Sequence, residues 1–213
     1  PPGRAALDVG ANIGLFSYAL SRLCPQVIAF EPQPSCAAVL RAMARGRNVT
    51  VREEAVSDAP GTLTLRVPLV DGRPSTGLAS LRADGSAGGA FQELRVPVVR
   101  LDDLELPPVG FVKIDVEGHE FEALRGAAGL LGRDRPVLLI EIEQRHIGFP
   151  LRDIFDWLEA RGYAGYFLQG GARRPVSEFD PVEHQERWLP DVLAERYNRI
   201  RGRYINNFLF LPA

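Results

Sequence analysis

The chain is most constrained by a repeated alternation between short apolar runs and longer amphipathic stretches. This alternation is typical of βαβ units, because parallel strands are buried on both faces while the helices between them bury one side. The expected strands are residues 5–9, 27–30, 49–53, 111–115, 137–142, 165–168 and 207–211, and the expected helices are residues 15–23, 34–45, 118–131, 151–161 and 189–200. The pattern predicts a Rossmann-like, three-layer α/β/α fold. Because the sequence contains neither an internal repeat nor a linker, we expect one domain over residues 1–213.

The alternation of strands and helices is interrupted between the third and fourth expected strands. Residues 62–67 and 94–98 both alternate apolar and polar side chains, which predicts a small antiparallel hairpin inserted into the domain. Between them, residues 71–89 are rich in glycine, serine and alanine. Loops of this length are usually either functional or disordered. A lid over the substrate and plain disorder are therefore the two alternatives for residues 71–89.

Composition argues against several classes of partner. A formal net charge of −2 at pH 7 gives no basic surface of the kind that binds nucleic acid. The two cysteines offer neither a disulfide framework nor metal-ligand spacing, so a cytoplasmic protein is expected. No apolar run is long enough to predict a membrane span. The first strand follows Pro1-Pro2-Gly3 directly, and the chain is therefore expected to be the core of a longer protein.

The first strand ends in the sequence DVGANIG, residues 8–14, and leads directly into a helix. In an open parallel sheet, ligands bind beyond the carboxyl ends of the strands, and glycines such as Gly10 and Gly14 let the backbone approach a ligand closely. Glu31 ends the second strand, where an ionised carboxylate can accept hydrogen bonds from both hydroxyls of a ribose. These segments predict a site for a nucleotide-like cofactor. An ordinary strand-to-helix turn capped by Asn12 is the structural alternative.

The glycine pattern separates two cofactors that would share this layout. The dinucleotide fingerprint G-x-G-x-x-G would require glycine at the positions of Gly10, Asn12 and Leu15. Two of these positions carry side chains, which would obstruct a pyrophosphate. S-Adenosylmethionine has no phosphate and carries a sulfonium cation and an amino-acid end, which suit groups such as Asp8 and Asn12 better. The loop therefore favours S-adenosylmethionine over a nicotinamide dinucleotide.

Two further acidic segments follow expected strands at the same edge of the sheet. Glu54 and Ala55 come after the third strand, where the Glu54 carboxylate could accept the exocyclic amine of adenine or could belong to a solvated surface pair. The sequence KIDVEGHE, residues 113–120, comes at the end of the strand expected beside the first. It brings Asp115, Glu117 and a histidine to the mouth of the crevice. An acid before a helix can also simply favour the helix dipole.

With these segments, the sequence resembles the FkbM-type methyltransferases, a family of class I S-adenosylmethionine enzymes. The resemblance rests on residues 8–14, Phe30-Glu31-Pro32, residues 113–120 with Leu124-Arg125-Gly126 after them, and the closing Asn207-Phe208-Leu209-Phe210. It implies a seven-stranded sheet whose final strand runs antiparallel. It also implies O-methylation of a hydroxyl on a sugar, a glycolipid or a secondary metabolite. The choice of acceptor would lie where the sequence departs most from the family, in residues 71–89 and 170–203.

The resemblance also implies roles for single residues. Gly10, Asn12 and Gly14 would line the methionine end of the cofactor, Asp8 would support the loop or the amino group, Glu31 would hold the ribose, Glu54 or Ala55 would flank the adenine, and Asp115 would lie beside the methyl-transfer site. His119 falls at a variable position of the family's motif.

Transfer of a methyl group from a sulfonium is an in-line displacement, and an alcohol acceptor must lose its proton to a nearby base. Asp115 and His119 are the candidate bases, one by position and the other by intrinsic pKa, and Glu117 would orient the acceptor. A small molecule is the expected acceptor. No metal is assigned, although Asp115, Glu117 and Glu141 could alternatively supply oxygen ligands for magnesium. A nicotinamide oxidoreductase and a cofactor-binding module without catalysis are the rival functions.

Overall fold

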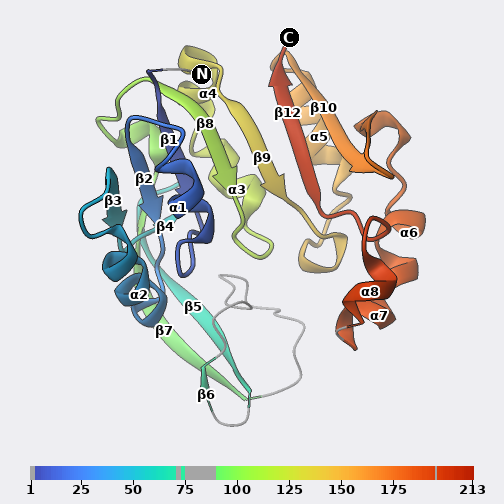
Figure 1. Cartoon of the computed structure of the whole chain (residues 1–213), viewed down its shortest axis with the longest axis horizontal. Helices are drawn as coiled ribbons and strands as arrows, with labels where there is room; N and C mark the ends of the chain where they lie inside the picture. The colour runs from blue at the N-terminus through green and yellow to red at the C-terminus, as the bar shows by residue number, and fades with distance from the viewer. Residues whose placement is uncertain (1–2, 71–72, 75–89, 195) are drawn as a thin grey trace.

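The computed structural model describes residues 3–70, 73–74, 90–194 and 196–213. Its centre is an eight-stranded sheet in the order β11-β10-β12-β9-β8-β1-β2-β3 (Figure 1). The strands are β1 (Ala5–Val9), β2 (Val27–Phe30), β3 (Val49–Arg52), β8 (Val109–Ile114), β9 (Val137–Glu141), β10 (Tyr163–Gln169), β11 (Ala172–Pro175) and β12 (Asn207–Pro212). Every strand expected from the apolar runs is present in this sheet, with small shifts at the ends.

The pairing of the strands places their carboxyl ends at one edge. β1 pairs in parallel with β2 and β8, β2 with β3, and β8 with β9. β12 runs antiparallel to both of its neighbours, β9 and β10, so the expected reversal of the final strand is confirmed. Residues that follow β1, β2, β8 and β9 therefore meet at the same edge of the sheet.

The sheet has one strand more than the expected seven. β11 pairs antiparallel with β10 through the turn Gly170-Gly171, whose φ angles are 59° and 81°. A two-residue hairpin turn with positive φ at both positions suits glycine, which adopts such angles without steric cost. Residues 170–203, expected to be irregular apart from one helix, thus begin with a hairpin. They continue with η3 (Val176–Glu178), α6 (Pro181–His184), η4 (Glu186–Trp188), α7 (Leu189–Leu193) and α8 (Tyr197–Ile200).

Helices cover both faces of the sheet, as the three-layer prediction requires (Figure 1). They are α1 (Leu15–Leu20), α2 (Pro34–Ala44), α3 (Glu120–Arg125), α4 (Ala128–Asp134) and α5 (Arg152–Glu159). Ala6 of β1 packs with Leu20 of α1 on one face, whereas Leu7 belongs to the large core with Leu124 and Leu158 on the other. Successive strand residues point to opposite faces, so one strand contributes to both layers. Within the described ranges, no helix combines the length and apolar character that crossing a bilayer demands.

The helix expected over residues 118–131 is interrupted, and α3 and α4 meet at Gly126. An added Cβ on Gly126 would stand 2.0 Å from the Ser57 carbonyl oxygen, so only glycine allows this close packing. The Asp102 carboxylate then accepts hydrogen bonds from two amides of the first turn of α4, at 2.8 and 2.9 Å. These contacts satisfy donors that the start of a helix leaves unpaired. Residues distant in the sequence therefore divide the helix.

A smaller sheet, in the order β4-β7-β5-β6, extends from the carboxyl edge of the main sheet (Figure 1). Its strands are β4 (Ala55–Val56), β5 (Gly61–Val70), β6 (Arg73–Pro74) and β7 (Phe91–Val99). β5 and β7 pair antiparallel, which confirms the expected hairpin and lengthens it at both ends. The hypothesis of a lid over residues 71–89 concerns positions that lie outside the described residues, apart from Arg73 and Pro74 in β6.

Candidate active site

The loop after β1 contains three residues with positive φ: Gly10 at 79°, Asn12 at 51° and Gly14 at 96°. Gly10 passes so close to the end of β8 that an added Cβ would stand 1.8 Å from the Asp115 carbonyl oxygen. Asparagine tolerates the left-handed region better than most residues, and the Asn12 amide donates to Glu31 Oε2 at 2.8 Å. The loop is therefore fixed against both strands that flank β1.

Glu31 lies at the carboxyl end of β2 and is buried. Its two oxygens accept hydrogen bonds from the amides of Asn12 and Gln33, each at 2.8 Å. Burial raises the pKa of the Glu31 carboxyl, and the two amides oppose that rise. Because a carboxylate offers about four acceptor sites, Glu31 can bind these amides and still accept hydrogen bonds from a ligand.

Asp8 and Gly14 make their contacts behind the loop. Asp8 is buried, and its Oδ2 accepts a hydrogen bond from Ser17 Oγ of α1 at 2.6 Å. Burial raises the pKa of Asp8. An added Cβ on Gly14 would stand 2.5 Å from Met43 and 2.6 Å from Leu40, both in α2. These two positions fasten α1 to β1 and α2, and they hold the loop from outside the pocket.

A pocket lies at the carboxyl ends of β1, β2 and β8, next to the hairpin. Its lining among the described residues is Val9, Gly10, Asn12, Phe30, Glu31, Pro32, Gln33, Glu54, Ala55, Val56, Leu65, Asp115, Val116 and Glu117. The wall thus brings together most of the site residues expected from the sequence, and it leaves out Asp8, Gly14 and His119. Four of these lining side chains are carboxylates, and none of them is lysine, arginine or histidine.

Glu54 and Ala55 lie on the side of the pocket next to the hairpin. Arg52 donates to both oxygens of Glu54, through Nε at 2.5 Å and Nη2 at 3.2 Å, which fixes the carboxylate at the wall. Ala55 is buried in a small apolar cluster with Leu65 of β5. Leu65 also lines the pocket, so the hairpin supplies part of the wall, which the sequence did not predict.

Lys113, the only lysine of the chain, is buried on β8 between two acids. Its Nζ lies 3.1 Å from Asp115 Oδ2 and 4.0 Å from Glu141 Oε2. The Phe16 ring of α1 covers the ammonium, with its centroid 5.1 Å from Nζ. Burying a charge is costly unless it is paired, and Lys113 is paired with the acids that had suggested a magnesium site. The described residues contain no group of three or more His, Cys, Asp or Glu side chains arranged to hold a metal.

The turn after β8 presents Glu117 to the pocket in a strained conformation. Glu117 has a φ of 51°, in the left-handed region that costs a residue with a Cβ roughly 1–2 kcal/mol. Glu120 of α3 holds the turn, because its Oε1 accepts hydrogen bonds from the Gly118 amide at 2.9 Å and the Val116 amide at 3.3 Å. Burial raises the pKa of Glu120 to about 7. Burial and the neighbouring acids raise the pKa of Glu117 to about 8.

His119 points elsewhere. Its Nε2 is hydrogen-bonded to Ser57 Oγ at 2.9 Å, and its Nδ1 lies 3.8 Å from Glu122 Oε2. These contacts connect the start of α3 with the segment after β4. Of the two bases expected from the sequence, only Asp115 belongs to the pocket wall.

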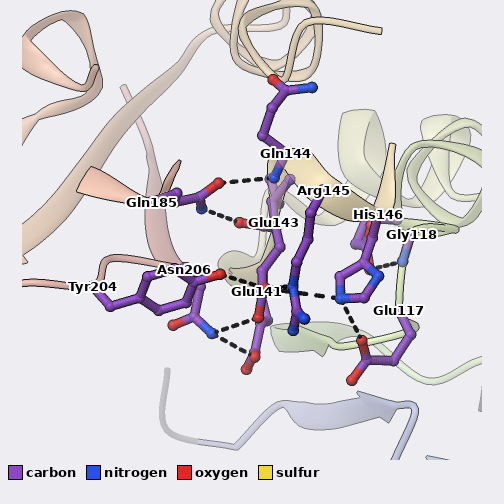
Figure 2. A network of polar contacts seen from close by, with 12 residues as sticks. Glu117, Gly118, Glu141, Glu143, Gln144, Arg145, His146, Gln185, Tyr204 and Asn206 are labelled. Atoms are coloured by element: carbon purple, nitrogen blue, oxygen red, sulfur yellow. Dashed lines mark hydrogen bonds and ion pairs between the residues drawn. The ribbon is translucent and has the colours of Figure 1, made fainter. Parts of the chain in front are cut away.

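A second histidine, His146 of the 3-10 turn η2 (Gln144–His146), takes a place near the wall that the sequence did not predict. Its Nε2 lies 3.3 Å from Glu117 Oε2 (Figure 2). Glu143, just beyond β9, approaches the same His146 nitrogen at 3.8 Å and accepts hydrogen bonds from Arg145, Tyr204 and, at 3.2 Å, Asn206. A signal was available, because His146 follows the strand that neighbours β8 and parallel strands end at one edge.

The strand order, with parallel strands on both sides of β1 and the antiparallel β12 between β9 and β10, defines a methyltransferase-like α/β fold. The family model described as the methyltransferase FkbM domain matches residues 8–164, and the chain belongs to that family. The 31-O-demethyl-FK506 methyltransferase FkbM of Streptomyces tacrolimicus is 34% identical over 211 residues, covering 85% of this chain and 76% of that protein. Methyltransferase sdnD of Sordaria araneosa is 32% identical, covering 59% of this chain and 61% of that protein.

Solved structures agree on the fold. The methyltransferase FkbM of Methylobacillus flagellatus superposes with a TM-score of 0.58 at 18% identity, covering 98% of this chain and 43% of that chain. A TehB-like SAM-dependent methyltransferase of Corynebacterium glutamicum gives a TM-score of 0.50 at 12% identity, covering 100% of this chain and 82% of that chain. At these identities the likeness shows the fold alone. This chain spans less than half of the Methylobacillus protein and 61% of the Sordaria relative.

Proposed function

We propose that the chain binds S-adenosylmethionine in this pocket and transfers its methyl group to a hydroxyl of a small molecule. The observation that carries the proposal is the chemistry of the wall, in which the described residues supply four carboxylates and no basic side chain. A sulfonium cation, the hydroxyls of a ribose and the amine of adenine all call for acceptors or negative charge. A pyrophosphate calls for donors and positive charge, which argues against a nicotinamide cofactor.

The residues of the wall suggest how the cofactor would be held. Glu31 would accept the ribose hydroxyls at the end of β2, and Gly10 and Asn12 would border the methionine end. Glu54 and Ala55 would flank the adenine, next to the hairpin. Family membership and the SAM-dependent neighbour from Corynebacterium glutamicum support the same cofactor. When bound, S-adenosylmethionine would supply the electrophilic methyl group.

The positions of Asp115 and His119 relative to the pocket wall favour different roles for the two residues. Asp115 lines the pocket, but its carboxylate is already paired with the Lys113 ammonium at 3.1 Å, which suits it to orienting the acceptor. His119 is engaged with Ser57 and is not among the lining residues described, so its placement gives no support for a role as base.

An alcohol is the acceptor class that we propose. The relative from Streptomyces tacrolimicus is named for a 31-O-demethyl-FK506 substrate, which supports a hydroxyl on a secondary metabolite as the first acceptor to test. A sugar or glycolipid hydroxyl is the next class. Acceptor choice would depend on residues 170–203 and on residues 71–89.

Titration calorimetry with S-adenosylmethionine, S-adenosylhomocysteine and NAD tests the cofactor. We expect the first two to bind and NAD to give no saturable heat; binding of NAD alone would overturn the proposal in favour of an oxidoreductase. Mass spectrometry of 31-O-demethyl-FK506 and a panel of sugar and glycolipid alcohols, incubated with cofactor and protein, then tests transfer. Cofactor binding without S-adenosylhomocysteine release on any acceptor would support a binding module instead.

A further inference from the structure

The hydroxyl of an alcohol acceptor must give its proton to the protein as the oxygen attacks, and Glu117 is the wall carboxylate best placed to receive it. Glu117 lies on the pocket, whereas His119 does not, and Asp115 already faces the Lys113 ammonium. The positive φ of Glu117 is maintained by the Glu120 carboxylate, which binds the amides on either side of it. Strained backbone conformations that the surrounding structure holds in place are often found at functional sites.

The surroundings of Glu117 are almost entirely acidic. Asp115 at the end of β8, Glu120 of α3, and Glu141 and Glu143 at the end of β9 all disfavour its ionised form. The exceptions are Arg145, whose guanidinium interacts with the Glu117 charge, and His146, whose Nε2 lies 3.3 Å from Glu117 Oε2 and 3.8 Å from Glu143 Oε2 (Figure 2). His146 Nε2 is completely enclosed, and within the described ranges no group makes a hydrogen bond of ordinary geometry with it. His146 Nε2 therefore lies near two carboxylates, one in the pocket wall and one behind it.

The carboxylate behind His146 is the fixed one. Although burial opposes it, hydrogen bonds from Arg145 and Tyr204 lower the pKa of Glu143, so Glu143 stays ionised at neutral pH. Burial and the Arg145 guanidinium lower the pKa of His146. Burial also raises the pKa of Glu120 and of Glu141 to about 7, but of these three carboxyls only Glu117 is among the lining residues of the pocket described above. A base whose pKa lies near the working pH is the most effective.

We propose that Glu117 holds a proton beside His146, gives up that proton to the solvent when a cation enters the pocket, and then accepts the hydroxyl proton of the methyl acceptor. The inference rests on the proposed function and adds a residue role to it. Glu117 is the catalytic base, and His146 is a positioning residue that acts through Glu117.

The step balances. The acceptor oxygen forms a bond to the methyl carbon, the bond from that carbon to sulfur breaks with its electron pair going to sulfur, and the hydroxyl proton goes to the Glu117 carboxylate. The positive charge of the sulfonium disappears in the same step. Burial and the four neighbouring acids then again favour the protonated form of Glu117 that the step has just produced.

Cofactor binding as a function of pH tests the inference without an acceptor. S-Adenosylmethionine carries the sulfonium charge and S-adenosylhomocysteine does not. Because that charge also lowers the pKa of the ligand's own amine, the ratio of the two affinities is compared between the unaltered chain and Glu117→Gln. If binding of the cation releases a proton from Glu117, the ratio for the unaltered chain, divided by the ratio for Glu117→Gln, should rise about tenfold between about pH 6.5 and about pH 8.5. Calorimetry in buffers of different ionisation enthalpy should detect the released proton directly.

Three variants assign the effect. Glu117→Gln is the reference, in which the ligand amines and the other acids still titrate and the Glu117 carboxyl is absent. In His146→Gln the rise should move to higher pH, because the ionised Glu117 then loses the nearest group that can donate a hydrogen to it; a merely structural role of His146 would weaken both ligands equally and leave the profile in place. His184→Gln is the matched control. His184, in α6, packs on Phe179 and has no part in the pocket wall described above, so the profile of this variant should equal that of the unaltered chain.

A second measurement needs no variant at Glu117. In the imidazole NMR spectrum of the 15N-labelled chain, the resonances that vanish in His146→Gln should move on addition of S-adenosylmethionine and much less with S-adenosylhomocysteine. A ratio that changes with pH as it does in Glu117→Gln, or His146 signals that respond alike to both ligands, would overturn the inference while leaving the proposed function intact. Failure of both ligands to bind would overturn the proposed function.

Discussion

Glu31 Oε2 accepts a hydrogen bond from the Asn12 amide at 2.8 Å, so one buried carboxylate joins the end of β2 to the loop after β1. The other oxygen of Glu31 binds the Gln33 amide, which begins the turn into α2. Two loops of the pocket wall are therefore held in place before any ligand binds. Preorganisation of this kind lowers the cost of binding, because less conformational freedom is lost.

Glu31→Gln should weaken binding of both S-adenosylmethionine and S-adenosylhomocysteine by at least about tenfold. The substitution replaces a charged acceptor by a neutral amide, and hydrogen bonds to a charged group contribute about 1.5–3 kcal/mol. Titration calorimetry measures the effect. Glu53→Gln is the matched control: Glu53 follows the neighbouring strand β3, is exposed, and pairs with Arg41 on the outside of the molecule. Unchanged affinity in Glu31→Gln would contradict the assignment of Glu31 to the ribose.

Gly10→Ala should lower the free energy of unfolding by about 2–4 kcal/mol, since it combines a positive φ with a backbone collision. The added Cβ would stand 1.8 Å from the Asp115 carbonyl oxygen. Gly46→Ala separates the two effects, because Gly46 has a φ of 70° and no atom within 4 Å of the added Cβ. We expect about 1 kcal/mol for that control in urea denaturation. Equal losses in the two variants would show that the close approach of β1 and β8 carries no cost.

Local signals in the sequence were sufficient for the elements that bear the proposed cofactor site. The βαβ rhythm located β1, β2 and β8, and the parallel arrangement brought Glu31 and Asp115 to one edge. Contacts between segments that are distant in the sequence could not be predicted from local patterns. The break at Gly126 depends on Ser57 and Asp102, and the approach of His146 to Glu117 depends on how η2 folds back over the end of β8.

The difference between local patterns and long-range contacts also explains why the eighth strand and the packing of the hairpin were not predicted. Gly170-Gly171 is a recognisable hairpin turn, but the flanking residues of β11, Ala172–Pro175, are too polar and too exposed to stand out as a strand. Leu65 reads as one apolar residue of an alternating strand, and its place in the pocket wall follows only from how the hairpin packs beside Ala55. An apolar pattern predicts which face of a strand is buried and does not predict which element buries it.

Lys113→Met should destabilise the fold by about 1–3 kcal/mol at neutral pH, because it leaves Asp115 and Glu141 close together without their cation. Both acids are partly exposed, which keeps the loss below that of a fully buried pair. Burial and the neighbouring Asp115 raise the pKa of Glu141 to about 7, so the loss should shrink as the pH falls and Glu141 takes up a proton. Denaturation at about pH 5.5 and about pH 7.5 measures the difference. Arg4→Met, which removes a partly exposed partner of Asp134, should cost less than about 1 kcal/mol at both.

Glu120 should make the fold less stable as the pH rises. Burial raises its pKa from an ordinary 4.5 to about 7 in the folded chain. A raised folded pKa means that the folded state binds the proton more tightly, so the stabilisation is complete below about pH 4.5 and is lost as the pH rises through about 7.

Glu120→Gln removes this titration while keeping an oxygen that can accept from the amides of Gly118 and Val116. Between about pH 5 and about pH 8, the unaltered chain should therefore lose about 1–3 kcal/mol more unfolding free energy than the variant. Urea denaturation at the two pH values gives the comparison. The control is Glu159→Gln. Glu159 is exposed at the end of α5 and pairs with Arg152, so the pH dependence of this variant's unfolding free energy should match that of the unaltered chain. A variant at Glu120 that loses stability as steeply as the unaltered chain would show that this carboxyl is ionised in the folded protein throughout the range. The Val116–Gly118 turn would then be held by a charged carboxylate, and the strain at Glu117 would be supported by an ion instead of a neutral acid.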